Sequence, residues 1–414
     1  MNRQLITGNR AAAWGARLAG ADYMPAFPIT PQTEIIETLA AWSASGEAPT
    51  RVVMLESEHS MLTAAGAAAA TGVRVFTATS SQGLLYAMEM MYATAGWRAP
   101  YVMVNVSRGV ASPVTLESDH NDVLSARDSG FLQIHCATCQ EVLDAVLIAY
   151  RLGEDSRVRL PVLVNQDGFY LSFTREPVDI PEAQEVKAFL PPFDAMGVEF
   201  RASRPVSQAV AVLGGSPYSY FRYEMHLAAQ AASVAYDGVA REFEGQFGRA
   251  WPQVEAYRCE DAEYVYFMTG AFSTKARVAV DRLREAGSKV GLVRPRLYRP
   301  FPRERLRELM RGRKAVIVVD QNISMGKGGV LATELASALY GMAQAPLLIE
   351  FVGGLGGRDI APEEFVEMAD VAADAAGRGE APPPRLLFTA AELREVRKLQ
   401  AIASAERGEL RRVP

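Results

Sequence analysis

The feature that most constrains the fold is a regular alternation of strand and helix patterns between residues 7 and 167. Short apolar runs alternate with segments whose apolar residues recur at helical spacing. We predict helices at 9–20, 32–43, 58–71, 82–95 and 140–152, and strands at 22–27, 51–55, 73–78, 100–106, 131–135 and 161–166. This order predicts an α/β fold with a doubly wound parallel sheet, which binds ligands outside the carboxyl ends of its strands.

The rest of the chain predicts a second, smaller α/β domain. An irregular, proline-bearing stretch (169–205) and a long helix (217–248) come before it. Its predicted strands are 264–268, 290–293, 315–319 and 347–352, and its predicted helices are 274–286, 303–311 and 329–340. We therefore expect a first domain at 1–248, a second at 249–362, and a linker with a C-terminal helical tail at 363–414.

The tail differs in character from both domains. Three consecutive prolines, 382–384, mark a linker. Thr389 and Glu392 then form a capping box that opens a charged helix, which we expect to end near Arg407. This segment has too few apolar residues to form a third domain.

Composition narrows the class of protein. The 414 residues are 49% apolar with a formal net charge of -5, and no lysine- or arginine-rich run would follow a nucleic-acid backbone. No apolar run suits a membrane helix and the N-terminus has no signal pattern, so we expect a cytoplasmic protein without nucleic-acid or membrane partners. Cys136 and Cys139 form a C-x-x-C without a second pair, which favours thiols packed at a helix start over a metal site.

Unusual polar residues follow several predicted strands: Thr30, Glu58, the segment 79–82 and Arg108. Glu58 has two interpretations. It could cap the helix that follows, although Ser57 alone would suffice. It could instead be an acid or acceptor in a crevice, because the alanine-rich helix can lie close to its neighbours and a buried carboxylate needs a partner or a proton.

Other polar or glycine-rich motifs fit structural roles better. Residues 326–329 and 353–357 match neither G-x-G-x-x-G after a strand nor a phosphate loop, so we expect tight turns. The adjacent residues 119–122 (DHND) favour a turn held by side-chain hydrogen bonds over a metal site. The chain contains neither G-x-S-x-G nor H-E-x-x-H, which argues against a simple hydrolase. Without G-x-G-x-x-G, a nicotinamide-dependent dehydrogenase is also disfavoured.

Six stretches together resemble one family. They are FPITPQTEI (27–35), ESEHSM (56–61), the run from Thr77 to Arg108, SDHNDVLSARDSGF (118–131), NQDGF (165–169) and GGLGGRDI (353–360). Their order and spacing resemble those of the alpha subunit of 2-oxoacid:ferredoxin oxidoreductases, the pyruvate synthase group, over roughly residues 1–360. The resemblance implies a pyrimidine-type thiamine diphosphate domain followed by a domain like the C-terminal domain of transketolase.

The resemblance also implies an active site shared between chains. In this family the beta subunit carries the G-D-G…N motif for Mg²⁺ and diphosphate, and this chain lacks that motif. No iron–sulfur cysteine spacing is present, so the [4Fe-4S] clusters would reside in partner subunits of the gamma and delta type. The complex would convert a 2-oxoacid and coenzyme A to an acyl-CoA and pass electrons to ferredoxin or NAD.

Carried over residue by residue, the resemblance assigns roles at the strand ends. Glu58 would be the acid at the aminopyrimidine ring nitrogen of thiamine diphosphate, where burial would keep its proton available at neutral pH. Arg108 would bind the substrate carboxylate, and Thr30 would meet the substrate carbonyl. Further cofactor contacts are expected from Pro28, Ile29, Ser81 and Gln82.

Structural alternatives stay open for these assignments. Arg108 could form an ion pair with Asp119 or Asp122, and Thr30 could cap the helix that begins near Pro31. For the whole chain, a noncatalytic scaffold subunit of the same complex is the main alternative to a catalytic subunit.

Two departures from the family pattern concern the substrate. Many pyruvate-type members have Asn-Arg-Ala where this chain has Ser107-Arg108-Gly109, and Ser118 replaces the usual glycine. Loss of a methyl group beside Arg108 predicts a larger pocket. We therefore expect either pyruvate or a larger oxoacid such as phenylglyoxylate.

Overall fold

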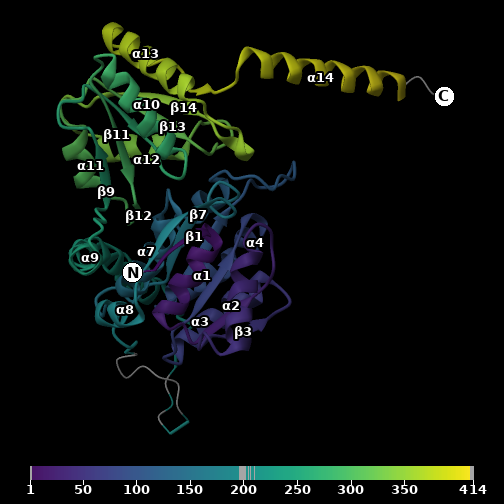
Figure 1. The fold of residues 1–414 in the computed structure, drawn as a ribbon, viewed down its shortest axis with the longest axis vertical. Coiled ribbons are helices and arrows are strands. Elements are labelled where there is room, and N and C mark those ends of the chain that lie inside the picture. The colour runs from purple at the N-terminus through teal and green to yellow at the C-terminus, as the bar shows by residue number, and fades with distance from the viewer. Residues whose placement is uncertain (1, 195–201, 204, 206, 209, 411–414) are drawn as a thin grey trace.

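The chain folds into two α/β units that lie one above the other (Figure 1). The computed structural model describes residues 2–194, 202–203, 205, 207–208 and 210–410. Helix α9 (Gly215–Phe247) lies beside the junction of the units, and the last helix, α14 (Ala390–Leu410), projects away from both. Within the described residues, no helix is long and apolar enough to cross a membrane.

The first unit is built on a mostly parallel sheet. Its adjacent parallel strands are β4 (Phe76–Thr79), β5 (Val102–Ser107), β7 (Val162–Asp167) and β6 (Leu132–His135). A parallel bridge between Tyr23 and Val75 extends the sheet to β2 (Tyr23–Ala26) and β3 (Arg51–Met54). The predicted doubly wound sheet is confirmed.

Small residues let the helices of this unit pack closely. Helix α1 (Gly8–Ala19) starts where the Thr7 hydroxyl accepts the Arg10 N–H at 3.1 Å. On α1, a Cβ at Gly15 would lie 2.7 Å from the Val146 side chain on α7 (Cys139–Gly153), so only glycine permits this approach. Helices α2 (Thr33–Ser45) and α3 (Glu58–Ala70) follow β2 and β3 as predicted.

The prediction of one helix at 82–95 was wrong. The segment forms α4 (Ser81–Tyr86) and α5 (Met88–Gly96), separated by Ala87. Apolar residues recur at helical spacing through both helices. A one-residue turn between them does not interrupt this spacing, so the sequence pattern did not predict it.

The prediction that 169–205 is irregular was also wrong in part. It contains β8 (Arg175–Ile180), which pairs antiparallel with β1 (Asn2–Thr7), and α8 (Ala183–Phe189). Proline is tolerated in a two-stranded ribbon because it need not donate to a second neighbour, and Pro177 therefore misled the interpretation. Residues 195–201 and 204 of this stretch lie outside the described residues.

The second unit has its own sheet, in the order β15-β14-β13-β10-β11-β9. The strands are β9 (Val254–Tyr257), β10 (Tyr264–Phe267), β11 (Val290–Pro295), β13 (Ala315–Asp320), β14 (Leu347–Val352) and β15 (Arg385–Leu386). All neighbours are parallel except β9 and β11. The predicted helices are present as α10 (Ser273–Glu285), α11 (Arg303–Met310) and α12 (Val330–Leu339).

The sequence did not predict α13 (Pro362–Arg378), which falls in the segment expected to be linker and tail. Its apolar face packs into the core of the second sheet through Phe365, Met368, Ala369, Ala372 and Ala375. The segment directly after residue 362 is therefore packed structure. Farther on, the capping box of α14 is confirmed, because Glu392 N–H donates to the Thr389 hydroxyl at 3.2 Å and Thr389 N–H donates to the Glu392 carboxylate at 2.6 Å.

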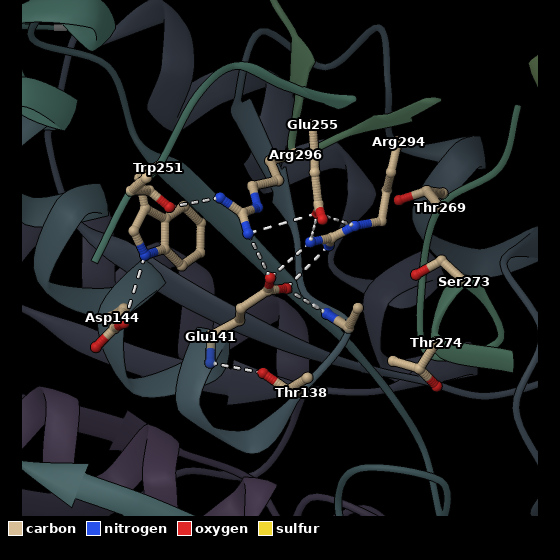
Figure 2. A network of polar contacts seen from close by, with 12 residues as sticks. Thr138, Glu141, Asp144, Trp251, Glu255, Thr269, Ser273, Thr274, Arg294 and Arg296 are labelled. Carbon is tan, nitrogen blue, oxygen red and sulfur yellow. Dashed lines mark hydrogen bonds and ion pairs between the residues drawn. The ribbon is translucent and has the colours of Figure 1, made fainter. Parts of the chain in front are cut away.

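Two features join the units. Strand β12 (Leu297–Arg299), from the second half of the chain, pairs antiparallel with β6 of the first sheet. Figure 2 shows the other, a buried ion-pair network between α7 and the second sheet. Glu141 on α7 accepts from Arg294 at 2.5 and 2.9 Å and from Arg296 at 2.9 Å, and Glu255 also binds Arg294. Burial raises the pKa of Glu141, but the two arginines outweigh it and lower this pKa to about 2.

Candidate active site

Glu58 lies at the carboxyl end of β3, as the first residue of α3. Its side chain is 6% exposed. Ser57 is the N-cap residue, and its hydroxyl accepts the Ser60 N–H at 3.2 Å. Because Ser57 already caps the helix, the Glu58 carboxylate is available for another role. The neighbouring Glu56 is exposed, and a hydrogen bond from Ser60 lowers its pKa.

Because Gly83 has no side chain, the Glu58 carboxylate has room to lie beside α4. A Cβ at Gly83 would lie 2.6 Å from Glu58 Oε1 and 2.5 Å from Thr79 Oγ1. Both distances are shorter than van der Waals contact, so any side chain at this position would displace the carboxylate. The ends of β3 and β4 thus bring Glu58 and Thr79 together over the start of α4.

Arg108 lies at the end of β5, 8% exposed, and points toward the same edge of the sheet. Its guanidinium donates to the Thr30 carbonyl oxygen at 2.6 Å and to Gln82 Oε1 at 2.7 Å. No carboxylate of the described residues forms an ion pair with it, so the alternative of a pair with Asp119 or Asp122 was wrong. Burial lowers the pKa of Arg108. A buried guanidinium that is held by neutral oxygens and makes no ion pair can receive an anionic ligand.

The loop before α2 brings Thr30 to the site by its backbone. Helix α2 begins at Thr33 with Gln32 at the N-cap position, so Thr30 is not the cap, and that alternative was wrong. The Thr30 and Pro28 side chains are exposed and Ile29 is half-buried. The Thr30 hydroxyl has no hydrogen-bond partner among the described residues. The loop therefore presents one hydroxyl and two apolar side chains at an open edge.

Asp122, in α6 (Asn121–Ser125), has a role that the sequence interpretation missed. Its Oδ2 accepts from the Ser81 N–H at 3.0 Å, from Asn105 Nδ2 at 3.1 Å and from the Arg108 N–H at 3.2 Å. Its Oδ1 accepts from the Ser107 hydroxyl at 2.7 Å. Burial raises the pKa of Asp122 to about 6. Asp119 forms the expected kind of side-chain hydrogen bond, to the Asn121 N–H at 3.0 Å, but residues 121 and 122 belong to α6, and the Asp122 carboxylate reaches across to the ends of β4 and β5.

Both units hold residues 119–122 in place, the first through Asp167 and the second through Gln321 and Gly356. His120 N–H donates to the Gln321 carbonyl at 2.7 Å, and the His120 ring lies 2.7 Å from Asp167 Oδ1. Gly356 N–H donates to Asp119 Oδ2 at 3.3 Å. The segment 353–357 forms the tight turn that the sequence predicted, with positive φ angles at Gly354, Gly356 and Gly357.

Several buried polar atoms at this edge lack a partner within the described residues: Thr79 Oγ1, Ser80 Oγ, Gln82 Nε2, Arg108 Nε and Ser118 Oγ. Leaving such an atom unpaired costs about 1–3 kcal/mol, so a group of them marks a place where a ligand completes the hydrogen bonds. Hydroxyls, an amide nitrogen and a guanidinium, beside the buried carboxylates of Glu58 and Asp122, suit an aminopyrimidine ring and an anionic substrate. The residues present therefore fit the aminopyrimidine part of thiamine diphosphate.

The pocket beside Arg108 is not enlarged in the way that the sequence predicted. A Cβ at Gly109 would lie 2.6 Å from the Thr115 side chain and 3.1 Å from Asp119 Oδ2. Thr115 thus already occupies the volume that a methyl group at 109 would fill, and the missing methyl leaves no extra room. The sequence could not reveal this, because Thr115 approaches only through the fold of the loop.

The two cysteines of the C-x-x-C follow the carboxyl end of β6, which is separated from β5 by β7. Cys136 and Cys139 are buried where β6 leads to α7, without a disulfide, and burial raises the pKa of both thiols. No group of three or more metal-ligating side chains occurs within the described part of the chain.

Comparison with known families defines the class of protein. Residues 14–240 match the family "Pyruvate flavodoxin/ferredoxin oxidoreductase, thiamine diP-bdg", and residues 262–365 match "Pyruvate:ferredoxin oxidoreductase core domain II". A thiamine diphosphate-binding domain followed by a smaller parallel α/β domain is the arrangement of the two units in Figure 1.

Relatives narrow the class to one family. Pyruvate synthase subunit PorA of Methanothermobacter thermautotrophicus is 41% identical, over 88% of this chain and 94% of that protein. Ketoisovalerate oxidoreductase subunit VorA of Pyrococcus horikoshii is 39% identical, over 89% of this chain and 93% of that protein. The chain therefore belongs to the alpha subunits of 2-oxoacid:ferredoxin oxidoreductases, in the pyruvate synthase group.

Solved structures share the fold. A 2-oxoglutarate:ferredoxin oxidoreductase from Magnetococcus marinus matches with a TM-score of 0.71 at 20% identity, over 89% of this chain and 65% of that one. A split-gene transketolase, as an inactive beta4 tetramer, matches with a TM-score of 0.52 at 14% identity, over 90% of this chain and 99% of that one. The predicted likeness to transketolase-type enzymes is confirmed for the fold.

Proposed function

We propose that this chain contributes the acid and the substrate-binding side chains to the active site of a thiamine diphosphate-dependent 2-oxoacid:ferredoxin oxidoreductase. The observation that carries the proposal is the group of unpartnered buried polar atoms around Arg108, next to the buried Glu58 carboxylate. A subunit that served only as a scaffold would gain nothing from this arrangement, because each unpaired buried group destabilises the fold.

Each side chain has a role that its surroundings support. Thiamine diphosphate, when bound, supplies the electron sink for loss of carbon dioxide from a 2-oxoacid. Glu58 would hold a proton at the pyrimidine ring nitrogen, at a place dry enough to strengthen that hydrogen bond. Arg108 would bind the substrate carboxylate, and the exposed Thr30 hydroxyl would donate to the substrate carbonyl. Further contacts to the cofactor would come from Pro28, Ile29, Ser81 and Gln82.

We further propose that the site is completed by partner chains. A beta subunit would supply Mg²⁺ and diphosphate binding, and gamma- and delta-type subunits would hold the [4Fe-4S] clusters that lead to ferredoxin or NAD. Coenzyme A would accept the acyl group. The exposed edge that carries Pro28 and Thr30 supports a site open to a second polypeptide. The cytoplasmic location expected from the sequence stays part of this proposal.

For the substrate we propose pyruvate, with the branched 2-oxoisovalerate next. Relatives named for pyruvate and for ketoisovalerate are about equally similar to this chain, at 41% and 39% identity. The main argument for phenylglyoxylate was a larger pocket beside Gly109, but Thr115 fills that space. Steady-state rates of the assembled complex on the three oxoacids, with coenzyme A, test this order. A preference for phenylglyoxylate would contradict it.

Replacing Glu58 tests whether the chain is catalytic. We expect Glu58→Gln in the assembled complex to lower kcat by about 10²–10⁴-fold, because glutamine cannot supply the acidic proton. Glu56→Gln is the matched control, since Glu56 is exposed two residues away, and it should leave the rate unchanged. A noncatalytic scaffold predicts nearly normal turnover for both variants.

A further inference from the structure

Asp122 bridges the segments that follow two adjacent strands, β4 and β5. It receives backbone N–H groups from Ser81, after β4, and from Arg108, after β5. It also binds the Asn105 amide and the Ser107 hydroxyl, both on β5. A fully buried carboxylate that accepts several hydrogen bonds fixes the relative position of the groups that donate them.

The backbone that Asp122 holds at Ser81 is strained. Ser81 has a φ of +49°, a conformation that favours glycine over residues with a Cβ. Its hydroxyl lies 2.9 Å from the Gly109 carbonyl oxygen, the residue after Arg108. A strained residue persists only where its surroundings hold it, and the bond from Ser81 N–H to the Asp122 carboxylate does so here.

The position of Ser81 contributes to that of the Arg108 side chain. The next residue, Gln82, accepts from Arg108 Nη2 at 2.7 Å, so the guanidinium is aimed partly by the residue that follows Ser81. Asp122 therefore acts on Arg108 twice, through the Arg108 backbone and through the chain from Ser81 to Gln82. Its own carboxylate makes no ion pair with the guanidinium.

We propose that Asp122 is a positioning residue for oxoacid binding, which holds the Ser81 and Arg108 backbones so that the Arg108 guanidinium meets the substrate carboxylate. This inference rests on the proposed function, because it takes Arg108 as the carboxylate-binding residue. Asp119, on the same loop, makes different contacts: its side chain binds the Asn121 and Gly356 backbones and none at the ends of β4 or β5.

The test uses Asp122→Asn in the assembled complex. We expect kcat/KM for pyruvate to fall by about 10- to 100-fold, mostly through KM, because the guanidinium loses its alignment while Glu58 keeps its place. The control is Asp320→Asn, which removes another fully buried carboxylate that accepts backbone N–H groups, in the second unit. Asp320→Asn should leave KM unchanged, whatever it does to thermal stability.

A double-mutant cycle with Arg108→Lys distinguishes positioning from a general structural effect. If Asp122 acts through Arg108, the double variant should be little worse than Arg108→Lys alone. Additive losses, or a normal KM for Asp122→Asn while Arg108→Lys is impaired, would overturn the inference alone. A normal KM for Arg108→Lys would overturn the assigned role of Arg108 together with it.

A second substitution covers the case in which Asp122→Asn does not fold. Asp122→Glu keeps the charge and the acceptor atoms but shifts them by one methylene group. We expect a smaller rise in KM that is again non-additive with Arg108→Lys. An unchanged KM for Asp122→Glu would contradict the inference.

Discussion

Two buried polar regions of this chain contrast sharply. In the network between the units, Glu141 and Glu255 meet Arg294 and Arg296 with opposite charges in direct contact (Figure 2). At the edge formed by β4 and β5, Arg108 meets only neutral oxygens, and several nearby polar atoms have no partner in the described part of the chain. Both regions are buried, but only in the first do direct ion pairs balance the charges.

The difference shows in the acidity of one carboxylate from each region. Arg294 and Arg296 lower the pKa of Glu141 to about 2 despite its burial, whereas burial raises the pKa of Asp122 to about 6. In the network between the units, opposite charges compensate one another, and their contacts stabilise the fold. Uncompensated groups cost stability, and their persistence indicates a function that uses them.

The largest expected effect is on the stability that the ion-pair network between the units provides. Glu141→Gln leaves Arg294 and Arg296 without a buried counter-charge, so we expect the free energy of unfolding to fall by about 3–5 kcal/mol. Chemical denaturation measures the change. Glu242→Gln, which breaks an exposed pair with Arg151, is the control and should cost less than about 1 kcal/mol. Equal costs for the two variants would show that the network contributes no more than a surface pair.

Acid should weaken the same ion-pair network in the wild-type protein. The Glu141 pKa is about 2 in the folded state, below its ordinary value of 4.5, so its contribution is present above pH 4.5 and is lost as the pH falls toward 2. That contribution is about 3 kcal/mol, at 1.36 kcal/mol for each pH unit. Denaturation curves between pH 6 and 2 should therefore converge for the wild type and Glu141→Gln. Parallel curves would contradict this.

At the edge formed by β4 and β5, the expected effect is on activity. Gly83→Ala places a Cβ within 2.6 Å of the Glu58 carboxylate and within 2.5 Å of the Thr79 hydroxyl. We expect kcat/KM to fall by about 100-fold, because catalytic groups tolerate little displacement. Gly96→Ala, where a Cβ meets no atom within 4 Å, is the matched control. Normal activity for Gly83→Ala would mean that the Glu58 position is not restricted as described.

The smallest effect is expected in the tail. Thr389→Ala removes one half of the capping box of α14, which should destabilise the start of that helix by about 1 kcal/mol. Hydrogen exchange of residues 390–396 measures the change. Ser404→Ala, in the middle of α14, is the control. Beyond its first turn, where Glu392 pairs with Arg358 of the second unit, α14 projects away from both units, so catalysis should not change in either variant (Figure 1).

Several elements could be predicted because their signals are local. The alternation of the sheets, the long helix α9 and the capping box at Thr389 each depend on residues within one turn or strand. The split at Ala87 and the ribbon of β1 and β8 could not, because one is a turn of a single residue and the other pairs segments about 170 positions apart. Helix α13 was missed because it directly precedes a proline-rich stretch.

At the site, the sequence identified residue types and strand ends, while the fold decided their partners. Glu58 and Arg108 could be singled out as charges that follow apolar strands, and their family resemblance suggested roles. The role of Asp122 was hidden, because its bonds to Ser81 and Arg108 cross 41 and 14 positions of the chain. Gly109 was misjudged for the same reason, since Thr115 reaches it only in the folded loop.

The sequence by itself determined the two mostly parallel sheets and the edge at which polar residues collect, because period and strand order follow from local patterns. Only the tertiary structure decided which charges are neutralised. Arg294 and Arg108 are both buried arginines, yet one faces carboxylates and the other faces neutral oxygens. That distinction depends on distances between elements far apart in the chain, which no local pattern encodes.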